Sequence, residues 1–154
     1  MRNIILVITL AFTLRSAAAE SDTITPIRIL TWNIKMLPRA ATFIHHHPVI
    51  RARLIPTELI RQPADVIIFQ ESFDGKAMRI IKRKLKKAYP YNQGYQNRKV
   101  ITYKRAGGVV MFSKYPMKEI ESIKYSKQIG VDKIGAKGAM LVEVDCPKHK
   151  IQVL

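Results

Sequence analysis

Cysteine is almost absent from the sequence: Cys146 is the only one in a chain of 154 residues. A single cysteine excludes an intramolecular disulfide framework and any zinc site built from several cysteines. A small chain without such cross-links depends on its hydrophobic core for stability. We therefore expect Cys146 to be an unreactive residue in a turn.

Acidic residues are also scarce, with 11 Asp and Glu against 27 Lys and Arg, which gives a formal net charge of +16. A protein with this excess of positive charge attracts anionic partners. Phosphate esters, lipid headgroups and nucleic acids all belong to that class, and the charge alone does not choose among them.

Long apolar runs are missing as well. The longest, Ile4 to Leu14, has eleven residues, whereas a membrane-spanning helix needs about 18. It follows a short basic start at Arg2 and precedes three alanines, Ala17 to Ala19. This order is typical of a secretory signal peptide. We expect residues 1–19 to be removed and residues 20–154 to be secreted or periplasmic, with 25 basic and 11 acidic side chains.

Strand-like and helix-like patterns alternate along residues 20–154, without repeats or low-complexity linkers. This order favours one α/β or α+β unit. The predicted strands are 27–33, 65–71, 107–113, 139–144 and 148–154, and the predicted helices are 49–61 and 76–88. Because the sequence ends inside a strand-like run with no turn or polar tail, we expect residues 20–154 to be an incomplete domain.

The two predicted helices differ in character. In 49–61 the apolar residues near helical spacing are Ile50, Leu54, Ile55 and Leu59, with Pro56 as a kink or a restart. In 76–88 a narrow apolar stripe is surrounded by Lys and Arg; the stripe is Ala77, Ile80, Ile81, Leu85 and Ala88. The basic face of 76–88 is interpreted as solvated, with binding to an anionic membrane as the alternative.

Two polar residues stand at the ends of predicted strands. Asn33 ends 27–33, and Glu71 ends the almost continuous apolar run 65–71, which is typical of a strand covered on both faces. If both strands end at one edge of a sheet, an amide and a carboxylate meet there. Mg²⁺ commonly takes one or two carboxylates together with water and substrate phosphate. A solvated loop position for Glu71 is the alternative.

Three ordered motifs resemble the opening motifs of the endonuclease/exonuclease/phosphatase superfamily: Trp32-Asn33-Ile34, Gln70-Glu71, and the segment from Gly107 to Pro116. Three further segments are similar to the neutral and bacterial sphingomyelinase branch: Met36-Leu37-Pro38, Glu71-Ser72-Phe73-Asp74 and the segment from Asp132 to Gly138. The resemblance implies an α/β (α+β) layered sandwich, the DNase I-like fold, with two packed sheets and helices outside. The chain would cover roughly the first half of it.

The resemblance also implies the chemistry. Glu71 would bind Mg²⁺ directly, Asn33 would lie near the metal and the scissile phosphate, and Asp132 and Lys137 would form a switch pair beside the substrate. The substrate would be sphingomyelin or a related membrane phospholipid, hydrolysed to ceramide and phosphocholine, with no obligate protein partner. The Thr-His, Asp-x-Asn and Asp-His motifs of that branch do not occur among the 154 residues. We therefore expect this chain alone to be inactive.

Two other functions stay open. A secreted nuclease of the same superfamily would share the Asn33 and Glu71 motifs and suit the basic charge, although the Leu37-Pro38 pair and the segment from Asp132 to Lys137 argue against it. A non-catalytic basic protein that binds anionic membranes or polyanions needs none of these motifs. The three consecutive histidines His45, His46 and His47 are not expected to converge on one metal, and a substrate-side role for them stays open.

Overall fold

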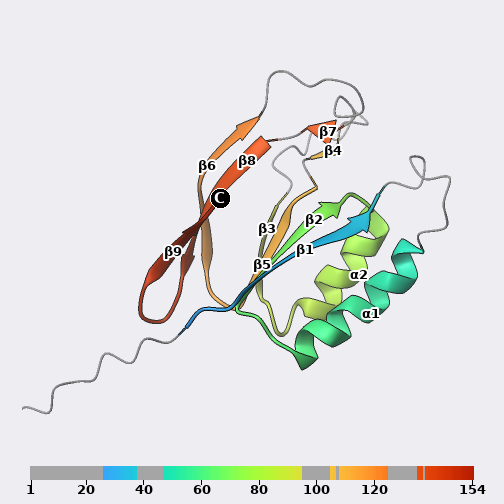
Figure 1. Ribbon diagram of the computed structural model, residues 1–154, viewed down its shortest axis with the longest axis horizontal. Helices are drawn as coiled ribbons and strands as arrows, with labels where there is room; N and C mark the ends of the chain where they lie inside the picture. The colour runs from blue at the N-terminus through green and yellow to red at the C-terminus, as the bar shows by residue number, and fades with distance from the viewer. Residues whose placement is uncertain (1–25, 38–46, 95–104, 107, 125–134, 137) are drawn as a thin grey trace, which may run out of the picture.

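The computed structural model describes residues 26–37, 47–94, 105–106, 108–124, 135–136 and 138–154. The elements follow one another along the chain as Figure 1 shows. The helices are α1 (Pro48–Arg61) and α2 (Gly75–Leu85). The strands are β1 (Ile29–Met36), β2 (Val66–Ser72), β3 (Tyr91–Gly94), β4 (Arg105–Ala106), β5 (Val110–Ser113), β6 (Met117–Lys124), β7 (Gly135–Ala136), β8 (Gly138–Asp145) and β9 (Lys150–Val153).

The first sheet has four strands in the order β1-β2-β5-β3. β1 and β2 are parallel, whereas β5 runs antiparallel to both β2 and β3. β2 is central and covered on both faces, which explains its nearly continuous apolar sequence. The predicted strands 27–33, 65–71 and 107–113 correspond to β1, β2 and β5. β3 was not predicted, because the polar residues of Tyr91–Gly94 carry no alternating pattern.

Both helices cover the same face of this sheet, as Figure 1 shows. The buried side of α2 consists of Ala77, Met78, Ile81 and Leu85, so the prediction for that helix is largely confirmed. The prediction for α1 is wrong at two positions. Its buried side is Ala52, Ile55, Pro56 and Leu59, whereas Ile50 and Leu54 are exposed. The helix continues through Pro56, and Ala52 takes the core position because it lies on the same side as Ile55 and Leu59.

The second sheet has three antiparallel strands in the order β6-β8-β9. It packs on the face of the first sheet opposite the helices: Val66 and Met111 contact a buried cluster with Val142, Val144 and Cys146. The predicted sandwich of two packed sheets with helices is therefore confirmed. β6 was not predicted, because the charged and apolar residues of Met117–Lys124 do not alternate regularly. In the structure its pairing with β8 is also irregular, with a register shift between Glu119 and Glu121. Cys146 is buried, and burial raises the pKa of its thiol.

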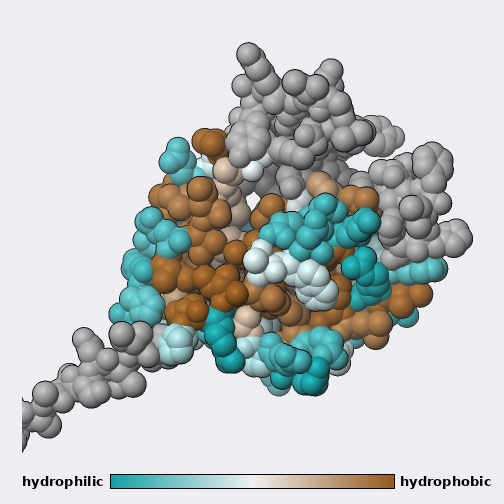
Figure 2. Space-filling model, in the orientation of Figure 1, coloured by the Kyte–Doolittle hydropathy of each residue, from teal (hydrophilic) through white to brown (hydrophobic). Residues whose placement is uncertain are grey.

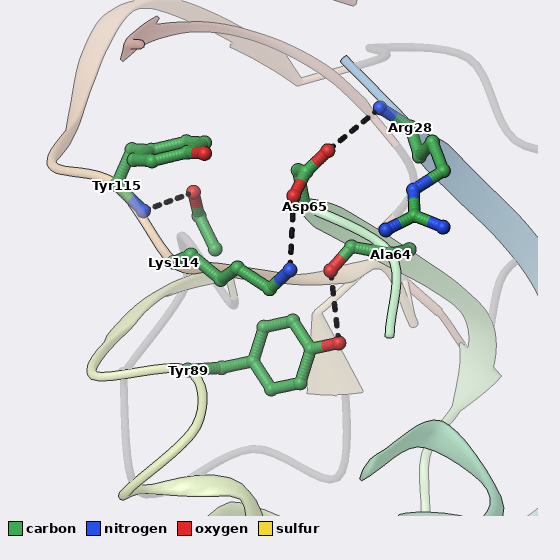
Figure 3. A network of polar contacts seen from close by, with 7 residues as sticks. Arg28, Ala64, Asp65, Tyr89, Lys114 and Tyr115 are labelled. Atoms are coloured by element: carbon green, nitrogen blue, oxygen red, sulfur yellow. Dashed lines mark hydrogen bonds and ion pairs between the residues drawn. The ribbon is translucent and has the colours of Figure 1, made fainter. Parts of the chain in front are cut away.

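A cluster of polar contacts joins the elements at the end of the first sheet where β1 and β2 begin (Figure 3). The buried Asp65 carboxylate accepts the Arg28 amide at 2.9 Å and the Lys114 ammonium at 2.9 Å. The hydroxyl of Tyr89, just after α2, donates to the Ala64 carbonyl at 3.0 Å. Together these bonds link the start of β1, the start of β2, the end of β5 and the exit of α2.

A broad apolar area covers the part of the surface where Figure 1 draws β6, β8 and β9, and it appears brown in Figure 2. Ile120, Ile123 and Leu154 are among the exposed large apolar residues of this half. Among the described residues, no helix is long and apolar enough to cross a membrane.

Candidate metal and phosphate site

The two strands that carry the predicted ligands lie side by side in parallel. In the pairing of β1 with β2, Asn33 is opposite Gln70, the residue before Glu71. Parallel neighbours end at the same edge of a sheet. The amide of Asn33 and the carboxylate of Glu71 therefore belong to the same end of the first sheet.

The backbone is irregular at this point. The register of β1 and β2 shifts between Asn33 and Met36, so two residues of β1 face one residue of β2. Lys35 and Glu71 both have left-handed backbone conformations, with φ of 45° and 53°. A non-glycine residue in this region costs about 1–3 kcal/mol. Such strain is found where the backbone must point a side chain in a particular direction, and here it falls on Glu71 itself.

Three hydrogen bonds hold the irregular part of β1. The side-chain oxygen of Asn33 accepts the Lys35 amide at 2.9 Å, an Asx-type turn that supports the left-handed residue. From α1, the Arg51 guanidinium donates to the carbonyl oxygens of Ile34 at 2.7 Å and Lys35 at 3.4 Å. Arg51 thus joins the first helix to the backbone next to Asn33.

Glu71 is half-buried, and within the described part of the chain its carboxylate makes no hydrogen bond and no ion pair. An amide oxygen retains a second acceptor position when it accepts one bond, so Asn33 can still offer an oxygen. Carboxylate and amide oxygens are hard ligands of the kind that Mg²⁺ prefers. The two residues therefore suit an Mg²⁺ site completed by water and substrate. The described residues contain no cluster of three or more His, Cys, Asp or Glu of the kind that forms an all-protein metal cage.

The residues after Glu71 connect this site to the glycine motif. Ser72 donates to the Gly108 carbonyl oxygen from its amide at 2.9 Å and from its hydroxyl at 2.6 Å. Gly108 has a φ of 73°, and a Cβ at this position would lie 2.5 Å from the ring of Phe73. Glycine is therefore required at 108 both for the backbone conformation and for the close approach of that ring.

Asp74 closes the same segment. Its amide donates to the Met36 carbonyl oxygen at 2.8 Å, which ties the end of β1 to the residue after Phe73. Its side chain accepts the Ala77 amide at 2.7 Å and so forms the N-cap of α2. The Glu71-Ser72-Phe73-Asp74 motif thus combines the candidate ligand, the contact with Gly108 and the start of a helix.

Other candidate residues lie outside the described part of the chain: Asp132, Lys137, Pro38, His45 and His46. Between Asp132 and Lys137 the structure describes only Gly135 and Ala136, which form β7 and pair in parallel with β4. Ala136, next to Lys137, is opposite Ala106, which lies two residues before the Gly108 that contacts Ser72. His47 is described and occupies the position before α1.

Comparison with known proteins agrees with this arrangement. The Endonuclease/Exonuclease/phosphatase family matches residues 30–146, a range that begins inside β1 and ends at Cys146. The chain belongs to this family.

Within that family the chain is similar to bacterial sphingomyelinases and phospholipases. It is 29% identical over 144 residues to Sphingomyelinase C 2 of Leptospira interrogans, which covers 83% of this chain and 23% of the relative. It is 28% identical over 156 residues to Phospholipase C of Staphylococcus aureus, which covers 94% of this chain and 47% of the relative. The chain thus spans 23% to 47% of the length of these relatives.

A solved structure, the beta toxin of Staphylococcus aureus in a mutant form with bound magnesium ions, superposes with a TM-score of 0.69 at 25% identity. The match covers 83% of this chain and 48% of the toxin. The fold is therefore shared, and a member of the same fold binds the metal that Asn33 and Glu71 suit.

Three features of the site were not predicted: the left-handed conformations of Lys35 and Glu71, the support from Arg51, and the contact between Phe73 and Gly108. Arg51 stands in a helix with no distinguishing spacing, so no sequence signal indicated it. The two glycines at 107 and 108 could have indicated a special backbone position, but the residue that packs against Gly108 lies far away in the sequence.

Proposed function

We propose that this chain carries the metal-binding part of an Mg²⁺-dependent phosphodiesterase that acts on sphingomyelin or a related phospholipid. The observation that supports it most directly is the pairing of β1 with β2, which brings Asn33 and Glu71 to one end of the sheet. The similarity to proteins named sphingomyelinase C and phospholipase C supports the substrate class.

Glu71 would bind the metal directly, and Asn33 would contribute an amide oxygen beside it or hold the scissile phosphate. A bound Mg²⁺ polarises a phosphoryl oxygen and stabilises the negative charge that develops during hydrolysis. Arg51 and the Asn33 turn would keep the backbone of this region in place. Asp132 and Lys137 would act on the substrate side, where a lysine can pair with phosphate or with the aspartate.

For the 154 residues alone we expect almost no turnover. Phosphodiester hydrolysis needs a base to activate water and an acid to protonate the leaving group, and each positioned group contributes about 10²- to 10⁴-fold. The Thr-His, Asp-x-Asn and Asp-His motifs that would supply these groups by resemblance do not occur among the 154 residues. Substantial metal-dependent release of phosphocholine by the purified chain would show that this expectation is wrong.

Metal binding tests the proposal without relying on activity. Isothermal titration with Mg²⁺, repeated with Mn²⁺ by electron paramagnetic resonance, should detect binding that Glu71→Gln weakens at least roughly tenfold, since even residues that only support metal ligands cost 10- to 100-fold. A second variant, Glu71→Asn, removes the carboxylate and tolerates the left-handed conformation better. Glu121→Gln, on an exposed position of β6, is the matched control.

The two Glu71 variants separate ligand loss from relief of strain. If both bind metal weakly while Glu71→Asn is at least as stable as the parent, Glu71 acts as a ligand. If both variants bind metal as tightly as the parent, Glu71 is not a ligand and the proposed site is wrong.

The nuclease alternative is favoured only by the basic charge, and it shares the same metal site. Plasmid nicking and phosphocholine release, measured side by side on a protein that also contains the missing acid-base residues, distinguish the two substrates. We also propose that residues 1–19 direct export. Amino-terminal sequencing of the exported protein should then begin at Glu20.

A further inference from the structure

The positive charge of the described chain is concentrated on its helical layer. The two helices together with Lys86 and Lys87 contain ten basic residues and one acidic residue, Glu58. The three strands of the second sheet and the turn between β8 and β9 contain four of each sign. Glu58 is itself paired with Arg61 at 2.6 Å. The charged side chains of the helical layer are therefore almost all cationic.

Apolar side chains are exposed within the same surface. Ile50 and Leu54 are 56% and 63% exposed, and their positions in α1 are opposite the buried side formed by Ala52, Ile55 and Leu59. Ile60, on the flank of α1, is 50% exposed. Figure 2 shows apolar and hydrophilic residues next to one another over the helices. The two aliphatic residues one turn apart thus point straight away from the core.

On α2, Lys76, Arg79 and Arg83 are exposed and follow each other at spacings of three and four residues, so they form one row. α1 and α2 pack beside each other on one sheet face, and the Lys84 ammonium donates to the Arg53 carbonyl oxygen at 2.9 Å. The row of positive charge on α2 therefore runs alongside the exposed apolar pair of α1.

We propose that this outer face of α1 and α2 binds the surface of a membrane that contains anionic lipid. Lys and Arg attract acidic headgroups, and aliphatic side chains between them enter the boundary of the acyl chains. The aliphatic pair is what favours lipid over nucleic acid, because a polyanion has no apolar layer to receive Ile50 and Leu54. The helices of this face contain no aromatic residue for base stacking.

This surface is separate from the Asn33 and Glu71 site, which lies at the end of the strands, so the proposal stands independently of the phosphodiesterase function. It also needs no substrate in the membrane. Vesicles of phosphatidylcholine with phosphatidylglycerol, free of sphingomyelin, are sufficient probes, with pure phosphatidylcholine as the neutral comparison.

The test is co-sedimentation of the chain with these vesicles, made both in full length and from Glu20 so that residues 1–19 do not dominate binding. We expect binding that requires phosphatidylglycerol and weakens with salt. Arg83→Glu should weaken partition at least about fivefold, because each lost surface charge near the headgroups has about that effect. Lys118→Glu, on exposed β6, makes the same charge change elsewhere and should have a much smaller effect.

A second pair of variants tests the apolar contribution. The first is the double variant Ile50→Ser and Leu54→Ser, which should weaken vesicle binding severalfold. The control is the double variant Ile120→Ser and Ile123→Ser, at positions on β6 that are 44% and 53% exposed, and it should leave vesicle binding unchanged. Circular dichroism of each variant verifies the fold. If only the charge variants matter and double-stranded DNA competes fully with the vesicles, the face binds polyanions and the lipid proposal is wrong. If the helix variants behave like the β6 controls, the face does not bind membranes.

Discussion

At the scale of single residues, the site depends on backbone geometry that two residues, Gly108 and Arg51, support. Glycine at 108 lets the Phe73 ring approach the backbone, and Arg51 holds the carbonyl groups beside Asn33. Neither residue would touch the metal. Both act on the segments that carry Asn33 and Glu71, and each can be tested by a substitution with a matched control.

Gly108→Ala should destabilise the protein by about 2 kcal/mol, because a residue with a Cβ pays for the left-handed conformation and would also collide with Phe73. The new Cβ would lie 2.5 Å from the ring. Gly75→Ala is the control: no atom lies within 4 Å of a Cβ at that position, and alanine suits the first turn of a helix better than glycine. Urea unfolding of the two variants measures the difference. Equal midpoints would refute the contact between Phe73 and Gly108.

Arg51→Ala should lower the free energy of unfolding by about 1 kcal/mol, the usual contribution of hydrogen bonds of this kind. It should also weaken Mn²⁺ binding, because the backbone that carries Asn33 loses its support at Ile34 and Lys35. Arg53→Ala, at an exposed position of the same helix, should change neither quantity. A loss of stability with unchanged Mn²⁺ affinity would limit Arg51 to a structural role.

At the scale of elements, the polar cluster around Asp65 fastens the strands at the end of the sheet away from the site. Burial alone would raise the pKa of Asp65, but the bonds from the Arg28 amide and the Lys114 ammonium outweigh it and lower the pKa below its ordinary value of 3.8. A carboxylate with a lowered pKa in the folded state stabilises the protein above the unfolded-state pKa, and this contribution disappears as the pH falls through the folded-state pKa.

Asp65→Asn should therefore unfold at lower urea concentration than the parent at pH 7, and the difference should shrink as the pH drops below about 3.8. Urea midpoints between pH 2 and pH 7 measure this. Glu58→Gln changes an exposed ion pair on α1 and should have little effect at any pH. A difference for Asp65→Asn that stays constant across the whole range would mean that the charge of Asp65 does not stabilise the fold.

The elements also show what the sequence could predict. β2 and α2 were predicted because an apolar run and a one-sided stripe are local patterns. The burial of α1 was predicted in part: Ile55 and Leu59 are buried, but Ile50 and Leu54 are not. Spacing alone could not decide, because Ala52 and Pro56 complete an equally regular stripe with Ile55 and Leu59. The side that faces the sheet is set by tertiary contacts such as the bond from Arg51 to Ile34.

The candidate site was likewise predictable from the sequence only in part. Asn33 and Glu71 were predicted from strand ends and from resemblance, and the parallel pairing of β1 and β2 brings those strand ends together. The left-handed conformation of Glu71 and the contact between Phe73 and Gly108 could not be predicted. They depend on the register of strands and on residues that are far apart in the sequence.

At the scale of the whole molecule, two cores of unequal size hold the three layers together. The core between helices and first sheet contains large, fully buried residues, including Phe69, Phe112, Ile81 and Leu85. The core between the sheets has a buried set of Val66, Met111, Val142, Val144 and Cys146. Because hydrophobic stabilisation grows with the apolar area buried, the second sheet should be held less firmly than the first.

We therefore expect the second sheet to open before the first, as cooperative units of unequal stability do. In native-state hydrogen exchange, amides of β8 should exchange faster than those of β2 and β5. Val144→Ala removes two methyl groups from the smaller core, a loss of about 2 kcal/mol. It destabilises the native state relative to both the partly open and the unfolded state, so it should accelerate exchange in β8 and in β2 alike. Val110→Ala, the same change in the larger core, should accelerate exchange in β2 and leave β8 almost unchanged, because the first sheet is still folded when β8 exchanges. Equal acceleration of β2 and β8 by Val110→Ala would mean that the sandwich opens as a single unit.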